Sequence, residues 1–135
     1  MLKLVVGVFF VLHGLVHLLY FGQSARLFEL QPGMVWPAGS WAFSGVLGEQ
    51  TTRLVASIAC ILAAIGFVGG GAAVLLEQFW WRPVVIAAAA FSTLLCIVFW
   101  DGTMRQLANQ GAIAVLINVA ILVAVLILRW PHFGF

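Results

Sequence analysis

The sequence contains very little charge. Only 7% of its 135 residues are Asp, Glu, Lys or Arg, whereas a soluble domain carries about 25%. A chain with so little polar surface cannot cover its apolar residues against water, so an ordinary soluble domain is excluded. The basic residues are also scattered along the chain, and this excludes the clustered surface that binds nucleic acid.

Catalytic signatures are missing as well. The sequence has no glycine-rich phosphate loop, no nucleophile beside a base and no C-x-x-C pair. Its two cysteines, Cys60 and Cys96, lie within apolar runs, where a thiol most often acts as a small hydrophobic side chain. The sequence therefore identifies no enzyme and favours a protein without catalytic activity.

What the sequence does contain is long apolar runs. Hydrophobic residues make up 64% of the chain, and four runs come close to the roughly 20 residues that cross a bilayer core. We predict an all-α fold in which residues 1–135 form a single membrane domain, an integral bundle of four transmembrane helices. The predicted helices cover residues of about 4–21, 54–76, 84–100 and 111–128.

Four crossings of the cell membrane would place both termini on the same side. The basic residues that normally decide the orientation are tied, because three fall on each side: Lys3, Arg82 and Arg129 against Arg26, Arg53 and Arg105. The free amino terminus and the Trp80–Arg82 cluster lead us to place the termini in the cytoplasm.

A long aromatic loop, residues 22–53, joins the first two predicted helices. Trp36 and Trp41 stand there among prolines and glycines, a composition that suits the headgroup zone of a bilayer. We expect this segment to form a lid over one end of the bundle, with short helical pieces near residues 24–30 and 40–47. The alternative is an interfacial loop that only anchors the protein.

Small residues recur in the second and third predicted helices. Gly66 and Gly70 stand four residues apart in one of them, and Ala87 to Ala90 form a run in the other. Small side chains allow helix backbones to approach closely in lipid. We therefore expect the second and third helices to touch.

Two histidines, His13 and His17, lie in the first predicted helix. Ionisable side chains are costly inside a membrane and mark functional sites by default. Their spacing of four residues places both imidazoles on one face of the helix. Such a pair can share a metal ion, but it cannot supply both axial ligands of a single haem, because those ligands must come from opposite faces.

Other polar side chains are predicted at the same depth in the bundle. Counted from the loop side at about 1.5 Å per residue, His17 lies level with Ser57 and Cys96, while His13 lies near Cys60, Thr93 and Asn118. Asp101 is at the rim. The candidate ligand-binding residues are therefore His13, His17, Trp36, Trp41, Cys60, Asn118 and Asp101.

Three interpretations of this polar layer remain open. The side chains could form interhelical hydrogen bonds that hold the bundle together. They could instead line a pocket for a lipophilic ligand such as a quinone. A metal site on His13 and His17 is the third, and it requires further ligands from Asp101, Cys60, Cys96 or Met104.

Three stretches resemble a known family. They are GVFFVLHGLVHLLYFG from residue 7, GFVGGGAAVLL from residue 66 and DGTMRQLANQGAIAVLINVAIL from residue 101. These stretches look like the small four-helix membrane proteins of the DoxX-like group, and the HGLVH stretch is similar to the start of short bacterial proteins labelled permeases. The resemblance implies a four-helix membrane bundle and, for some relatives, quinone-linked sulfur oxidation or redox stress complexes. It implies no catalytic role for His13 or His17.

We therefore expect a small multi-pass membrane protein that is a non-catalytic accessory or structural subunit of a membrane complex. Its partners would be the lipid bilayer and either other membrane subunits or further copies of itself. The alternative function is redox-associated binding of a lipophilic ligand, a quinone or a metal ion in a polar pocket beneath the first loop.

Overall fold

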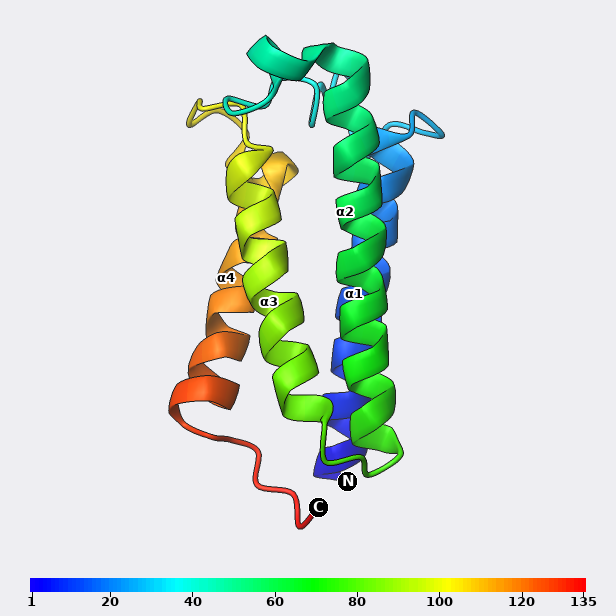
Figure 1. Ribbon diagram of the computed structural model, residues 1–135, viewed down its shortest axis with the longest axis vertical. Helices are drawn as coiled ribbons and strands as arrows, with labels where there is room; N and C mark the ends of the chain where they lie inside the picture. The colour runs from blue at the N-terminus through cyan, green and yellow to red at the C-terminus, as the bar shows by residue number, and fades with distance from the viewer.

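Four helices run side by side along the long axis of the molecule in the computed structural model, which describes residues 1–135 (Figure 1). The expected all-α fold is confirmed. Two short turns flank the last helix: η1 is a 3-10 turn and η2 a π-helical turn that continues α4. The elements are α1 Leu2–Ser24, α2 Ser44–Leu75, α3 Trp81–Val98, η1 Leu107–Gln110, α4 Ala112–Leu122 and η2 Val123–Ile127.

Three of these helices, α1, α2 and α3, are long and apolar enough to cross a membrane. The fourth apolar segment, Ala112–Ile127, is shorter. At about 1.5 Å per residue it reaches roughly 24 Å, against a hydrocarbon core of about 30 Å. The expected fourth crossing therefore remains a prediction, while the four-helix architecture itself is observed.

The first loop is shorter than the loop predicted from the sequence. α1 continues to Ser24, and it ends because Arg26 adopts a left-handed backbone with φ of 57°. No helical piece follows over residues 25–30. α2 begins at Ser44 rather than near residue 54, with a bend at Gly48, whose φ of 73° is open to glycine at little cost. The connecting loop is thus 25–43 rather than 22–53.

The most extensive contact between two helices is that of α1 with α2, and glycines make their close approach possible. A Cβ atom on Gly71 would lie 2.7 Å from the carbonyl oxygen of Gly7, and one on Gly14 would lie 3.0 Å from that of Ala64. The predicted contact between the second and third helices is also confirmed, because a Cβ on Gly66 would meet the Cβ of Ala88 at 2.9 Å.

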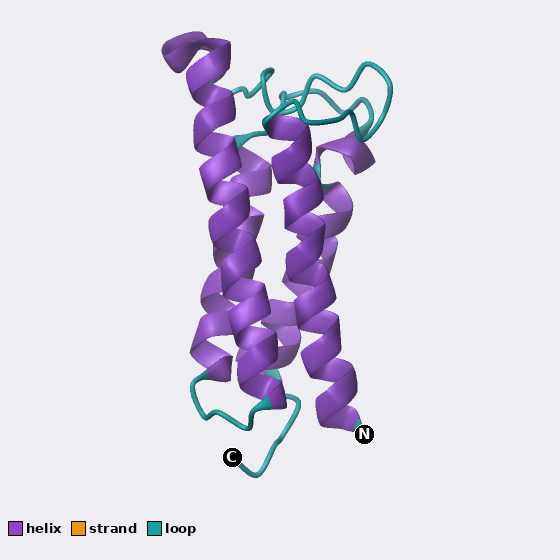
Figure 2. Cartoon of the chain, turned by 90° about the vertical axis from the view of Figure 1, so that its right-hand side faces the viewer, coloured by secondary structure: helices purple, strands orange, loops and turns teal.

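The first loop is fastened to the end of α3. The last carbonyl groups of a helix have no partner within it, and the loop supplies donors for two of them and for the carbonyl of Trp100 just beyond the helix end. Ser40 Oγ donates to Val98 O at 2.7 Å, and Trp41 donates from its backbone N to Trp100 O and from Nε1 to Ile97 O, both at 2.8 Å. The first loop lies at the end of the bundle opposite the termini (Figure 2), where it caps α3.

The other end of the bundle holds both termini (Figure 1). Lys3 pairs with Glu77 at 2.5 Å, which ties the start of α1 to the end of α2. Arg82 donates to the carbonyl oxygens of Arg129 and Pro131 at 2.9 and 2.5 Å, and these bonds hold the segment after η2 against the start of α3.

Candidate functional site

Four buried polar side chains from three helices form one hydrogen-bonded network. His13 and His17 come from α1, Ser92 from α3 and Asn118 from α4. His13 Nε2 lies 2.9 Å from Asn118 Oδ1, Asn118 Nδ2 lies 2.8 Å from Ser92 Oγ, and Ser92 Oγ lies 2.6 Å from His17 Nε2. The fourth distance, from His17 Nδ1 to the carbonyl oxygen of His13, is 3.0 Å and closes the ring.

The direction of each hydrogen bond follows from the one backbone carbonyl in the ring, that of His13. That carbonyl can only accept, so His17 Nδ1 carries a proton, and the neutral imidazole then accepts at Nε2. The Ser92 hydroxyl must donate to it and accepts in turn from the Asn118 amide. Asn118 Oδ1 is left to accept from a protonated His13 Nε2. Two neutral histidines satisfy every bond in the network.

Aromatic rings enclose the imidazoles. Phe67 of α2 packs against both, with ring centroids 4.6 Å from His13 and 5.4 Å from His17, and Phe9 stacks on His13 at 6.0 Å. The structure therefore brings His13 and Asn118 together at the depth predicted from the sequence. His13 and Asn118 line neither of the two cavities that lie beneath the first loop and are described below.

The geometry does not favour the metal hypothesis. Three of the four ring nitrogens of His13 and His17 take part in hydrogen bonds. No group of three or more His, Cys, Asp or Glu side chains that could hold a metal ion is present. Asp101, one of the proposed further ligands, accepts instead from the backbone N and the hydroxyl of Thr103. The third ligand that the hypothesis required is not assembled.

The remaining candidate residues take no part in the hydrogen-bonded network. Trp36 is only 5% exposed and packs in an apolar cluster with Cys60 and Cys96. Its indole Nε1 is buried without a hydrogen-bond partner, the one such side-chain atom in the protein. Trp41, by contrast, is exposed, and its Nε1 serves the capping of α3. Of these residues, only Trp36 and Asp101 line a cavity beneath the loop.

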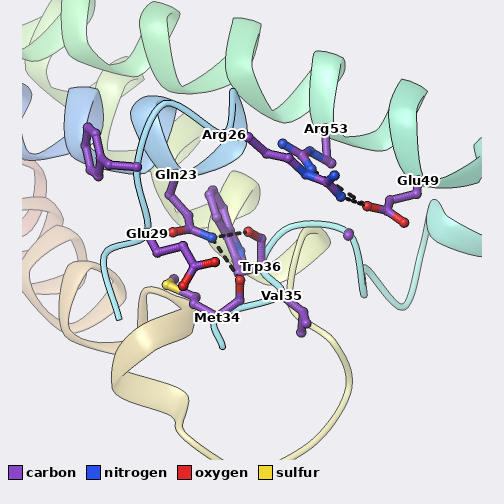
Figure 3. A pocket seen from close by; sticks show the side chains of 10 residues that line it. Gln23, Arg26, Glu29, Met34, Val35, Trp36, Glu49 and Arg53 are labelled. Carbon is purple, nitrogen blue, oxygen red and sulfur yellow. Dashed lines mark hydrogen bonds and ion pairs between the residues drawn. The ribbon is translucent and has the colours of Figure 1, made fainter. Parts of the chain in front are cut away.

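Two cavities lie beneath the first loop, and Trp36 lines both. The inner cavity, of about 390 Å³, lies between the loop and the adjoining ends of α1 and α2. Figure 3 shows Arg26, Glu49 and Arg53 together on one side of it, with Gln23, Glu29, Met34 and Trp36 on the other. The second cavity, of about 370 Å³, lies between the first loop and the α3–α4 connection, and it includes Asp101.

Sequence reasoning missed one residue of the polar network and several that build the loop side of the protein. Ser92 completes the polar network, and its only signal was its place beside Thr93. Gln23 donates to Met34 O at 3.0 Å and accepts from Leu30 N at 2.9 Å, so it holds the loop. Arg53 donates to Ser24 O from Nε and Nη2 at 3.0 and 2.6 Å. Their polarity alone gave no indication of these partners.

The long apolar helices and the internal polar network indicate a small multi-pass membrane protein. No protein-family model, no curated protein and no solved structure matches the chain. The comparisons therefore lend no support to the DoxX-like resemblance, and the class of the protein rests on its helices.

Proposed function

We propose that the protein is a four-span membrane protein that acts as a non-catalytic subunit by packing against other membrane helices. The observation that carries this proposal is the closed polar network. Its histidines form hydrogen bonds with Asn118, Ser92 and a backbone carbonyl. These bonds hold three helices together and occupy most of the nitrogen atoms that could act on a substrate.

A crevice between α1 and α4 supports packing against another helix. It has a volume of about 290 Å³, and nine of its ten lining residues are hydrophobic. Ala120 and Ala124 lie in it four residues apart, the small-residue spacing at which membrane helices approach closely. A helix from a partner subunit or from a second copy of the chain fits this surface.

Mass analysis of the protein purified in mild detergent tests the proposal. The wild-type chain should appear in a species heavier than its own 14.6 kDa. Ala120→Phe with Ala124→Phe fills the crevice and should release the monomer. Ala87→Phe with Ala90→Phe is the matched control on the exposed face of α3, and it should leave the assembly intact. A wild-type monomer with no copurifying subunit contradicts the proposal.

One observation favours a second function, the binding of a lipophilic redox ligand such as a quinone beneath the first loop. An unpaired buried donor costs about 1–3 kcal/mol, and Trp36 Nε1 is such a donor, on a side chain that lines both cavities. A ligand carbonyl would satisfy it. This is the redox association that the DoxX-like resemblance implies.

Extraction of the purified protein tests this second function. A bound quinone should appear by its absorbance and mass in wild type. Trp36→Phe should lose the quinone, and Trp41→Phe should keep it, because the Trp41 indole already has the carbonyl of Ile97 as its partner. Equal quinone content in the two variants, or none in wild type, excludes this function.

A further inference from the structure

Two hollows meet at the junction of α1 and α2 on the loop side. The inner cavity beneath the loop and an outer groove of about 680 Å³ share Arg26, Glu49 and Arg53 on their walls. Phe21 and Leu54 extend the groove towards the apolar part of the helices. The combined site is charged at the end of the bundle and apolar below it, which is the polarity of a lipid entering from the bilayer.

The charged side chains of the site keep free hydrogen-bonding capacity. Arg26 pairs with Glu49 but remains 68% exposed, so part of its guanidinium faces outward. Arg53 is only 14% exposed, and its Nη1 lies 3.7 Å from Glu49 while Nε and Nη2 bind Ser24 O. Glu29 accepts only one bond, from Gly33 N at 3.3 Å. The site therefore offers cationic donors on one side and a largely unused carboxylate on the other.

The balance of charge selects the ligand class. Two guanidinium groups and two carboxylates line the inner cavity, so the site is neutral overall and does not suit a simple anion. Guanidinium groups bind phosphate oxygens through paired N–H donors, and a carboxylate binds an ammonium group that has N–H donors. A zwitterion that carries both a phosphodiester and an ammonium group matches this arrangement.

We propose that this site binds the headgroup of a zwitterionic phospholipid with a primary ammonium group, the chemistry of phosphatidylethanolamine. Arg26 and Arg53 receive the phosphate, Glu29 receives the ammonium group, and an acyl chain follows Phe21 and Leu54 down the groove. The inference rests on the membrane embedding proposed above and assigns the site a ligand.

Native mass spectrometry of delipidated protein in detergent provides the test. Short-chain phosphatidylethanolamine, phosphatidylcholine and phosphatidylglycerol are titrated separately. Wild type should prefer the ethanolamine lipid over each of the others by about tenfold, the effect of roughly one charge-assisted hydrogen bond. Equal binding of the three lipids overturns the proposal.

Two variants separate the roles of the charges. Arg26→Gln should weaken all three lipids by about tenfold through the lost phosphate contact, and Glu29→Gln should abolish the preference for the ethanolamine lipid over the other two. Lys3→Gln with Glu77→Gln is the matched control, because it removes one ion pair at the opposite end of the bundle. Unchanged binding by the two site variants, or equal losses in the control, overturns the proposal.

The source of the headgroup is distinguished by glycerophosphoethanolamine, which has no acyl chains. Weak binding of this compound beside tight binding of the lipid supports a membrane ligand; equal binding rejects the lipid and leaves a soluble phosphate ester. Alkaline extraction of membranes keeps the two proposals apart. A chain released by alkali fails the proposed membrane embedding, whereas a retained chain without lipid selectivity fails this inference only.

Discussion

Asn118 is the residue that allows two histidines to lie in an apolar bundle. Its side-chain amide combines an acceptor and a donor, so it can accept a hydrogen bond from His13 N–H and donate one to Ser92 Oγ. An imidazole without such a partner would leave a polar group unsatisfied in the protein interior. One side chain on α4 thereby joins α1 to α3.

Removal of this amide should loosen the bundle without unfolding it. We expect Asn118→Leu to reduce the free energy of unfolding by about 1 kcal/mol, since interhelical hydrogen bonds in membranes average about 0.6 kcal/mol each and two are lost. Thermal unfolding in detergent measures the effect. Thr93→Val is the control, because Thr93 bonds only to Ala89 O of its own helix. A variant as stable as wild type would show that the network contributes nothing.

The network also fixes where the imidazole protons lie. His13 should carry its proton on Nε2 and His17 on Nδ1, because only this pair of tautomers satisfies every bond of the ring with neutral histidines. Nitrogen-15 chemical shifts of labelled protein in lipid distinguish the two tautomers. Asn118→Leu should change the shifts of His13 more than those of His17. Two identical tautomers in wild type would contradict the arrangement.

Depth along a helix was predictable only in part at the residue scale, and direction around the helix was not predictable. Counting residues from the loop side placed His13 level with Asn118 and Thr93, and the pairing of His13 with Asn118 is observed. The same count placed Ser57 level with His17, and this was wrong, because Ser57 Oγ bonds to Ser24 Oγ instead. The residue that α3 contributes to the network is Ser92 rather than Thr93, and the two differ because neighbouring residues of a helix point about 100° apart. Apolar residues are spread almost evenly around these helices, so the sequence did not show which side of each helix faces inward.

Among the helices, the pairing of α1 with α2 depends on glycines in both. We expect Gly71→Val to force α1 away, because a Cβ at this position would lie 2.7 Å from Gly7 O and 2.9 Å from Val11 N. Overpacking of this kind typically costs about 1–3 kcal/mol. Thermal unfolding in detergent again measures the change.

Gly69→Val provides a matched control for that substitution. Gly69 is on the same helix, two residues away, and a Cβ there meets no atom within 4 Å. Both variants replace a helical glycine with the same β-branched side chain, so any difference between them comes from packing against α1. Equal stability of the two variants would mean that α1 and α2 are not held as closely as described.

The loop elements were the least predictable part of the fold. Aromatic residues with prolines and glycines correctly placed the first loop at one end of the bundle, but the capping of α3 by Ser40 and Trp41 joins residues far apart in the sequence. Such bonds depend on the tertiary arrangement, for which local propensity carries no signal. The bend at Gly48 is a local feature, yet a glycine at this position is equally compatible with a loop and with a bent helix.

At the scale of the whole molecule, the ends of the bundle differ from its middle. Ion pairs are confined to the ends, with Lys3 and Glu77 near the termini and Arg26 and Glu49 near the loops. Between them, the polar side chains of the network bond to one another. This distribution suits a protein with water at two levels and lipid between them.

The number of crossings decides the side on which the carboxyl terminus lies. If α4 crosses, Gly134 should share its side with Phe79 and lie opposite Val46 and Arg105; if it does not, Gly134 should join Arg105. Single cysteines at these positions, labelled with an impermeant maleimide in intact cells, give the answer. The native Cys60 and Cys96 are buried and should leave little background.

With the termini in the cytoplasm, as we predict, only Val46→Cys and Arg105→Cys should react. Labelling of Gly134→Cys together with Arg105→Cys, but not of Phe79→Cys, would reduce the protein to three spans and leave the polar network without a membrane-spanning α4 to carry Asn118.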